Sequence, residues 1–422
     1  MTRTALVVGG GLLGVTSAWY LAERGFRVTV VERREATALD TSFANGGLIT
    51  PSQSDPWNGP GTAFNLIKWL GREDSPLLLQ PTALPGMWRW GLSFLANSRM
   101  KHWWPATEAN LRLGLYSAAS LRELRESLGL EYHHLSRGTL KIFRDEEALE
   151  HSDVLARSLA PIGLKHQALD PGQAIGLEPL LAPLRGELAG AIHYPDDESG
   201  DAHLFTRLME DRSRKAGVAF RFGAEVTGFR HRSGRIEALS CGDEELQAEV
   251  YILAAASRTP ALAAPLGLKL PIYPVKGYSL TLPVPDLEPM LSVPLVDFEQ
   301  KVVITPLGGR LRVAGTAEFA GFDSRENPRR SAGILKHTLR LLPQLAGRVK
   351  PAEVSYWNGL RPMTPDGPPI LGATRYPNLF MNAGHGPLGF TLAAGSSRAV
   401  ADLAAGREPE IPLAAYSAAR FS

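Results

Sequence analysis

Two clusters of residues in this chain have types and spacings from which chemistry can be inferred. Near the N-terminus, Gly9, Gly11 and Gly14 form the pattern GxGxxG. Near the C-terminus, residues 357–389 contain W-N-G-L-R-P-M-T-P-D-G-P-P and then A-G-H-G-P-L-G-F. The first pattern is typical of a loop that binds a dinucleotide. The second supplies an arginine and a glycine-lined helix start, which together can meet a substrate and a cofactor ring.

The glycine pattern lies where a dinucleotide-binding unit needs it. An apolar run at residues 5–8 predicts a strand, and residues 12–24 predict a helix that Gly25 ends. In such a unit the first glycine makes the turn, the second lets the backbone approach a pyrophosphate, and the third allows close packing of helix on strand. The helix dipole favours the phosphate charge. We therefore predict cofactor contacts at Gly9, Gly11, Leu12, Leu13 and Gly14.

A carboxylate follows near the spacing expected for a ribose contact. The second predicted strand, residues 27–31, ends at Glu32. A carboxylate at this position accepts a hydrogen bond from the 2′-hydroxyl of the cofactor ribose and repels the additional phosphate of NADP. The predicted contact region also includes Arg33 and Arg34, which follow directly.

The composition narrows the class of protein. A chain of 422 residues is too long for one ordinary core and predicts two domains. Its 45 Lys and Arg nearly balance its 43 Asp and Glu, which argues against nucleic acid and for a small molecule as partner. The single cysteine, Cys241, excludes internal disulfides and a cysteine-bound iron–sulfur cluster within this chain. No HExxH motif or cluster of His and Cys predicts a metal, so we expect an organic cofactor to carry electrons.

Signals for secretion or for a membrane span are missing from the chain. Met1 leads directly into the first predicted strand, and no apolar run of about 18 residues occurs, so we expect a cytoplasmic protein. Aromatic residues nevertheless gather in one region, namely Trp57, Trp69, Trp88, Trp90, Trp103 and Trp104. Such residues either dock a peripheral enzyme on the inner face of the cytoplasmic membrane or pack a cap over an active site. The lack of a flanking basic cluster favours packing.

The pattern changes kind several times between these clusters. Periodicity and start signals predict helices at residues 107–128, 146–160, 171–177, 203–216, 331–342 and 391–405. Runs of β-branched and aromatic residues between turn signals predict strands at residues 138–143, 218–222, 225–230, 236–240, 248–255, 278–282, 302–306 and 311–315. Residues 191–201 are expected to form a turn-rich link.

The strand types predict how these elements assemble. Residues 248–255 are almost wholly apolar, as in a buried parallel strand, so the chain is expected to return to the nucleotide-binding sheet there. The strands within residues 276–319 are typical of an antiparallel sheet with one face toward a ligand cleft. We therefore predict an α+β protein. Its discontinuous nucleotide-binding domain comprises residues 1–60, 190–262 and 355–422, and its inserted substrate or cap domain comprises residues 61–189 and 263–354.

Several segments together resemble a known family. They are V-V-G-G-G-L-L-G-V-T-S-A-W-Y-L, T-S-F-A-N-G-G-L-I, G-T-L-K-I-F-R, P-V-K-G-Y-S-L-T and W-N-G-L-R-P-M-T-P-D-G-P-P. From Leu6 to about Pro412 the chain is similar to the small subunit of FAD-dependent D-amino acid dehydrogenases. That family lies in the wider group of D-amino acid oxidase, glycine oxidase and sarcosine oxidase. The resemblance implies a Rossmann-like FAD-binding domain (βαβ, parallel sheet) with an inserted antiparallel-sheet substrate domain.

The resemblance also places residues at the cofactor. It implies that residues 41–48 run along the flavin and its phosphates, where adjacent glycines let the backbone approach a planar ring. A plain loop after a helix cap is the alternative. Ala256 stands where relatives commonly have glycine. The contacts implied in this way are Thr41, Ser42, Ala44, Asn45, Gly46, Gly47, Leu48, Val226, Ala254, Ala255, Ala256 and Gly359.

The resemblance assigns the substrate carboxylate to Arg361 in the segment G-L-R-P. A guanidinium suits this task because its planar fork donates two parallel charge-assisted hydrogen bonds. The alternative is an interdomain salt bridge to Asp366. Tyr278 is a second candidate, either for a hydrogen bond from its phenol to the substrate or for packing across strands.

The glycine-lined helix start is predicted to lie at the flavin pyrimidine. A helix N-terminus stabilises negative charge on the reduced ring, and His385 either adds a donor or fixes the loop. Pro387 replaces the threonine expected from relatives, which removes a hydroxyl and an N–H near the ring. The residues expected in this contact are Gly384, His385, Gly386, Pro387, Leu388 and Gly389.

These placements predict a reaction. An amino acid held by its carboxylate transfers its α-hydrogen as hydride to flavin N5, and the imino acid hydrolyses to a 2-oxo acid and ammonia. The FAD is expected to be noncovalent. Electrons pass to a quinone or another acceptor; an oxidase of secondary amino acids such as sarcosine, D-proline or hydroxyproline and a noncatalytic electron-relay subunit are the alternatives. A homo- or hetero-oligomer is left open.

Overall fold

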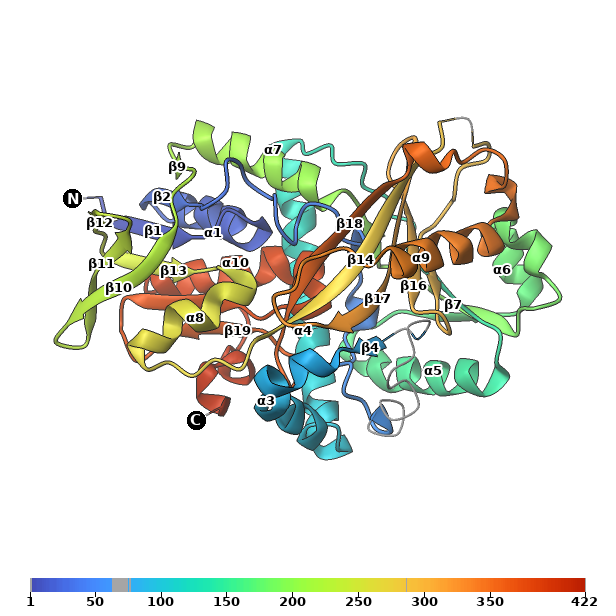
Figure 1. Cartoon of the computed structure of the whole chain (residues 1–422), viewed down its shortest axis with the longest axis horizontal. Coiled ribbons are helices and arrows are strands. Elements are labelled where there is room, and N and C mark those ends of the chain that lie inside the picture. The colour runs from blue at the N-terminus through green and yellow to red at the C-terminus, as the bar shows by residue number, and fades with distance from the viewer. Residues whose placement is uncertain (1, 63–74, 76, 286, 422) are drawn as a thin grey trace.

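Among the described residues, 2–62, 75, 77–285 and 287–421, this computed structural model forms two large β-sheets (Figure 1). In spatial order the first sheet contains β19 (Ile370–Ala373), β20 (Leu379–Ala383), β13 (Val250–Leu253), β1 (Thr4–Val8), β2 (Arg27–Val31) and β9 (Ala219–Arg221). The second contains β18 (Ser355–Met363), β14 (Tyr273–Pro283), β17 (Arg310–Phe319), β16 (Val302–Pro306), β15 (Leu295–Asp297), β5 (Thr139–Phe143), β7 (Gly190–Tyr194) and β6 (Gln167–Leu169), with β4 (Leu77–Leu79) paired to β17.

Smaller sheets and helices complete the architecture. The small sheets are β10 (Val226–Arg232), β11 (Arg235–Cys241) and β12 (Glu244–Leu246), and the pair β3 (Leu48–Ile49) and β8 (Glu198–Ser199). In the described part of the chain, the α-helices are α1 (Leu12–Glu23), α3 (Leu84–Ala96), α4 (Met100–Leu128), α5 (Glu146–Leu159), α6 (Pro171–Leu177), α7 (Ala202–Lys215), α8 (Thr259–Ala263), α9 (Pro328–Leu341) and α10 (Gly389–Ala404).

The first sheet is the predicted nucleotide-binding sheet. Strands β1, β2, β13, β20 and β9 are parallel where they pair, and only β19 runs antiparallel to its neighbour β20. The strand β13 is buried between β1 and β20, which confirms the predicted return of the chain to this sheet. Helices α1, α4, α7 and α10 bury one continuous apolar cluster with its strands. This arrangement is the predicted Rossmann-like α+β fold.

The second sheet offers two different faces. Strands β14, β17 and β16 are antiparallel, as predicted, and β18 adds to this sheet antiparallel to β14. Helix α9 covers one face, where alternate residues of β14 such as Leu280 and Leu282 join its apolar side. Because side chains alternate along a strand, the intervening residues of β14 face the first sheet. The cleft of interest lies on that side.

The domain boundaries predicted from the sequence separate three elements, β7, β18 and α4, from the sheet or core that they join. The sequence predicts the nucleotide-binding domain over residues 190–262 and 355–422, yet β7 pairs with β5 and β6, and β18 pairs with β14. It also predicts a turn-rich link at residues 191–201, which instead contains β7 and β8. Helix α4, predicted within the cap, packs on α1 and α10. Membership of a sheet or core depends on long-range pairing, which a local pattern does not reveal.

The tryptophan-rich region is divided between core and surface. Trp90 and Phe94 of α3 stack on each other in an apolar cluster between α3 and the second sheet. Trp103 is buried, and its Nε1 donates to Pro56 O at 3.0 Å. Trp88, in contrast, is 54% exposed. Trp69 lies outside the described residues. Within the described part of the chain, no helix combines the length and apolarity needed to cross a bilayer.

Candidate active site

A cavity of about 560 Å³ lies between the two sheets, within the size range of small-molecule sites. Residues predicted as cofactor or substrate contacts make up much of its lining. They are Gly11, Leu12, Leu13, Thr41, Ser42, Ala44, Asn45, Gly46, Gly47, Leu48, Ala254, Ala256, Tyr278, Gly359, Arg361, Gly384, His385, Gly386, Pro387, Leu388 and Gly389. The structure therefore gathers the N-terminal and C-terminal clusters of the sequence around one space.

The remaining predicted contacts lie outside this cavity. Gly9, Gly14, Glu32, Arg33, Arg34, Val226 and Ala255 are not among its lining residues. Gly14 is required by packing, because a Cβ there would overlap the carbonyl oxygen of Gly9. The Glu32 carboxylate accepts hydrogen bonds from Gly10 N at 2.5 Å and Arg34 N at 2.8 Å. Glu32 thus fixes the turn at the carboxyl ends of β1 and β2.

The loop at residues 41–48 is fixed to the second sheet by hydrogen bonds. Ser279 Oγ donates to Ala44 O at 2.6 Å, and Thr305 Oγ1 donates to Gly46 O at 2.7 Å. Gly47 has φ of 68°, and a Cβ there would lie 2.8 Å from Gly200 O, so this position needs glycine. The polypeptide backbone of the loop consequently faces the cavity at close range.

Two hydroxyls tie the cofactor loops to β18. Thr41 Oγ1 donates to Leu360 O at 2.9 Å, and Ser257 Oγ donates to the same oxygen at 3.2 Å. Leu360 precedes Arg361, so the strand that carries the arginine is joined directly to the loops at Thr41 and Ser257.

Arg361 is a cation without an acidic partner. Its guanidinium lies in the cavity, with Nη1 donating to Thr316 O at 3.2 Å and Cζ at 5.4 Å from the Trp57 ring centroid. Within the described residues, no carboxylate forms an ion pair with it, and burial lowers the pKa of Arg361 to about 10. The alternative pairing with Asp366 is wrong, because Asp366 pairs with Arg420 at 2.7 Å. An anionic ligand would supply the missing charge.

Tyr278 contributes to the site differently from the predicted substrate contact. Its ring belongs to the apolar cluster under α9, on the face of β14 opposite to Gly277 and Ser279. Its hydroxyl donates to Glu318, which also pairs with the buried Lys276. Burial, together with Glu318, raises the pKa of Tyr278. This geometry supports the packing alternative, because the phenol hydroxyl already has Glu318 as its partner.

The start of α10 provides partial positive charge at the cavity. No side chain caps this end, where Gly389 begins the helix directly after the turn Gly386–Leu388. His385 Nε2 lies 3.0 Å from Ser396 Oγ within the same segment. Burial lowers the pKa of His385 to about 3, so its imidazole is neutral. His385 therefore fixes the loop, and the free N–H groups of the helix start are left to interact with negative charge.

Ala256 adopts a conformation that favours glycine. Its φ is 46°, in the left-handed region, and it lines the cavity beside Ala254. Its departure from the pattern of relatives therefore has a backbone cost, because an L-residue with a Cβ is strained there.

Sequence reasoning missed part of the lining. Asp55, Lys141, Phe298 and Lys301 all border the cavity. They come from the loop before the tryptophan region, from β5, and from the turn between β15 and β16. Lys141 lies in the segment G-T-L-K-I-F-R, but nothing in that segment indicated which face it would occupy.

The donor set fits FAD. Gly11 and the backbone of the 41–48 loop line a cavity that can take a flat group, and the uncapped α10 start suits the anionic edge of a flavin. A model of the FAD dependent oxidoreductase (DAO) family matches residues 4–403. The chain belongs to this family.

Relatives and solved structures support the assignment to the FAD dependent oxidoreductase family. The chain is 46% identical over 418 residues to a D-amino acid dehydrogenase of Paramagnetospirillum magneticum, covering 99% of this chain and 98% of the relative. A D-amino acid dehydrogenase of Methylobacterium nodulans is 45% identical, with the same coverage. Glycine oxidase from Geobacillus kaustophilus is 25% identical with a TM-score of 0.75, covering 99% of this chain and 98% of that one.

L-proline dehydrogenase from P. horikoshii, at 20% identity, shares the fold with a TM-score of 0.79, covering 100% of this chain and 98% of that one. The predicted fold class, FAD dependence and family are confirmed.

Proposed function

We propose that this protein is a D-amino acid dehydrogenase that converts D-amino acids to 2-oxo acids and ammonia with noncovalent FAD. The observation that carries the proposal is Arg361, a guanidinium inside the cavity that the cofactor loops border, to which no described residue supplies a counter-ion. A substrate carboxylate there would accept two hydrogen bonds and neutralise the charge. The relatives from Paramagnetospirillum magneticum and Methylobacterium nodulans, which are named D-amino acid dehydrogenases and align with 99% of this chain, support the same activity.

The residues of the chain orient the substrate and stabilise charge. Bound FAD supplies the acceptor for the two electrons of the substrate. Arg361 would hold the α-carboxylate, so that the α-carbon has one orientation in the cavity. The imidazole of His385 is neutral, and its Nε2 lies within hydrogen-bond distance of Ser396 Oγ. His385 is therefore unsuited to act as a base, and we assign it no proton transfer. The α10 start would stabilise negative charge that develops on the cofactor.

We further propose that electrons leave to a quinone in an anionic bilayer. Support comes from α3 and the start of α4, where Leu84, Trp88, Leu92, Leu95 and Met100 are exposed apolar residues. The basic residues Arg89, Arg99 and Lys101 are exposed between them, and the sequence holds no acidic residue from Ser75 to Thr107. Apolar and basic groups together match the chemistry of an anionic membrane surface. The other side of α3 packs on β14 and β18 through Met87 and Trp90.

Anaerobic reduction of the flavin tests the activity. The purified holoprotein is mixed with D-amino acids, their L-enantiomers and N-methyl amino acids, and the flavin absorbance is followed. We expect bleaching by D-amino acids and none by their L-enantiomers. Bleaching only by N-methyl or secondary amino acids, or by none of the compounds, would refute the proposal. Oxygen uptake measured in parallel separates a dehydrogenase, which consumes little oxygen, from an oxidase.

A further inference from the structure

Two lysines border the cavity where the chemistry described so far does not require them. Lys301 Nζ lies 3.6 Å from the centroid of the Phe298 ring, and Lys141 Nζ lies 5.0 Å from the same centroid. All three residues line the cavity that contains Arg361. The two ammonium groups thus converge on one aromatic side chain, which presents its electron-rich face to cations.

The two ammonium groups are not neutralised by ion pairs. In the described part of the chain, neither lysine has a carboxylate oxygen within 4.0 Å that would make a salt bridge. Asp55 borders the same cavity and acts on both lysines electrostatically, as does Glu299, but neither carboxylate forms an ion pair with Lys141 or Lys301. Burial lowers the pKa of Lys141, and burial together with Lys141 lowers the pKa of Lys301 to about 8. In both cases desolvation of the ammonium group outweighs the attraction of the surrounding carboxylates.

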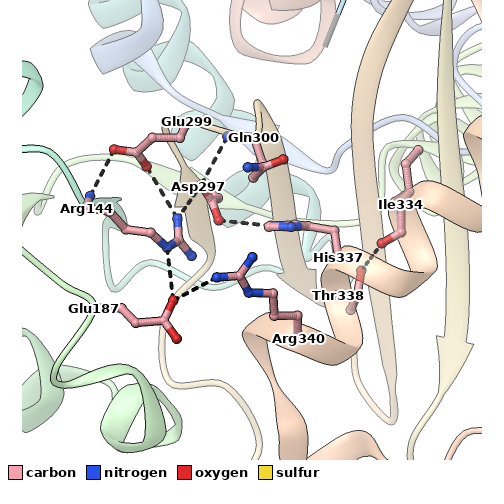
Figure 2. A network of polar contacts seen from close by, with 9 residues as sticks. All are labelled: Arg144, Glu187, Asp297, Glu299, Gln300, Ile334, His337, Thr338 and Arg340. Atoms are coloured by element: carbon pink, nitrogen blue, oxygen red, sulfur yellow. Dashed lines mark hydrogen bonds and ion pairs between the residues drawn. The ribbon is translucent and has the colours of Figure 1, made fainter. Parts of the chain in front are cut away.

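A network of polar contacts around Asp297 fixes the turn between β15 and β16, which carries Phe298 and Lys301. Figure 2 shows Asp297 between Arg144 and His337. Asp297 Oδ1 accepts from Arg144 Nη1 at 3.0 Å, and Oδ2 lies 2.9 Å from His337 Nε2. Asp297 Oδ1 also accepts from Gln300 N at 3.2 Å, which closes the turn itself. Asp297 is fully buried, and these contacts preorganise the turn from below the cavity.

The turn that carries Lys301 and the side chain of Arg361 lie beside neighbouring residues of β17. Arg361 donates to Thr316 O, and a Cβ built on the adjacent Gly315 would lie 3.3 Å from Lys301 O. The two cationic sites therefore flank the same short stretch of one strand. Arg361, Lys141 and Lys301 all line this one cavity, so a ligand bound in it is enclosed by all three cations.

We propose that Lys141 and Lys301 form the subsite for the substrate side chain and select D-amino acids that carry a second carboxylate. The inference rests on the proposed function, in which Arg361 holds the α-carboxylate. A side-chain carboxylate would supply the charge that the lysines lack, whereas a neutral amide of the same shape would not. The chemical class is a dicarboxylic amino acid such as D-glutamate.

Paired substrates that differ only in charge test the subsite. We expect kcat/KM for D-glutamate to exceed that for D-glutamine at least tenfold in the natural protein. Lys301→Met and Lys141→Met should each reduce this ratio about tenfold or more. Lys301→Glu should reverse the preference, so that D-glutamine becomes a better substrate than D-glutamate. The same variant should favour D-lysine over D-glutamine. Lys350→Met is the matched control, because Lys350 is an exposed lysine paired with Glu353, and its ratio should stay unchanged.

A binding measurement separates this proposal from the reaction. Glutarate and its monoamide are titrated into the oxidised holoprotein, and perturbation of the flavin spectrum reports their dissociation constants. We expect glutarate to bind at least tenfold more tightly, with the difference lost in Lys301→Met. Flavin content and melting temperature show whether each variant is folded. Equal affinities for the two compounds in the natural protein would overturn the subsite, even where D-alanine reduces the flavin. Failure of every D-amino acid to reduce the flavin would refute the activity, while the glutarate titration still decides the subsite.

Discussion

The guanidinium of Arg361 occupies the space in which a side chain on Gly277 would lie. Gly277 and Arg361 come from the adjacent strands β14 and β18, and a Cβ added at Gly277 would overlap the guanidinium. The absence of a side chain on one strand thus determines where the cation of the other can rest. This relationship is local, and neither residue shows it in the sequence.

Gly277→Ala should therefore impair substrate binding without loss of the cofactor. The added methyl displaces the guanidinium, and a small misplacement of an orienting group lowers the rate strongly, so we expect kcat/KM to fall at least tenfold. Steady-state kinetics on D-alanine and the flavin content measure the two effects. Gly228→Ala is the matched control, because a Cβ there meets nothing within 4 Å. Unchanged kinetics in Gly277→Ala would contradict the placement of Arg361.

Arg361→Ala tests the carboxylate contact itself. The loss of a charge-assisted pair in an enclosed site should cost about 3 kcal/mol, on the order of a hundredfold in kcat/KM, with FAD still bound. Arg361→Lys should recover little, since an ammonium lacks the planar fork. Arg230→Ala, on an exposed hairpin with Glu245, serves as the control. An Arg361→Ala enzyme with natural efficiency would remove the basis of the proposed function.

Ala256→Gly should stabilise the protein. The left-handed backbone at Ala256 costs an L-residue about 1–2 kcal/mol that glycine avoids, although glycine adds entropy to the unfolded chain. We expect a net gain of about 1 kcal/mol in the free energy of unfolding, measured by denaturant titration of the holoprotein. Ala255→Gly gives the opposite expectation, a loss of about 0.5–1 kcal/mol, because Ala255 has a φ of −88°. A loss of stability in Ala256→Gly would count against backbone strain.

Selectivity for an acidic side chain should decline above about pH 8, where Lys301 loses its proton. Below that pH, Lys301 is charged and attracts the second carboxylate; above it, the attraction falls. The charged groups that act on Lys301 are Lys141, which lowers its pKa, and Asp55, Glu299 and Asp297, which oppose that effect. The same ratio measured in Lys301→Met corrects for the titration of the two substrate amines, which differ in pKa. A ratio that does not change with pH would exclude Lys301 as its source.

Removing apolar surface from α3 should weaken membrane attachment. Leu92→Asp and Trp88→Asp replace exposed apolar residues with charges of the sign that anionic lipid repels. We expect less protein to sediment with vesicles that contain anionic phospholipid, and unchanged flavin reduction by D-alanine. Val154→Asp, an exposed apolar residue on α5, is the control. If the natural protein does not sediment with the vesicles, the bilayer is not its partner.

Local signals in the sequence predicted the nucleotide-binding unit well. The glycine turn, α1 and β2 follow from periodicity and turn chemistry within about thirty residues, which is the range over which such rules act. The 41–48 loop and Arg361 came from the family resemblance, and the structure places both at one cavity.

Long-range relationships were harder to predict. The strand β18 joins the second sheet through its pairing with β14, although the next strand in sequence, β19, belongs to the first. Helix α4 begins at Met100, earlier than predicted, because the tryptophan and proline residues at its start carry no helical periodicity. Lys301 reaches the cavity from a turn between two strands, and only the folded sheet reveals it.

The shared acceptor at Leu360 makes the two ligands interdependent. Its carbonyl oxygen receives the hydroxyls of Thr41 and Ser257, while the next residue, Arg361, projects into the substrate space. Ordering of the loops by one ligand therefore favours the strand geometry that the other requires. By reciprocity, a bound carboxylate should strengthen FAD binding by the same free energy with which FAD strengthens carboxylate binding. Under the proposed function, the substrate itself would therefore help to keep the flavin bound.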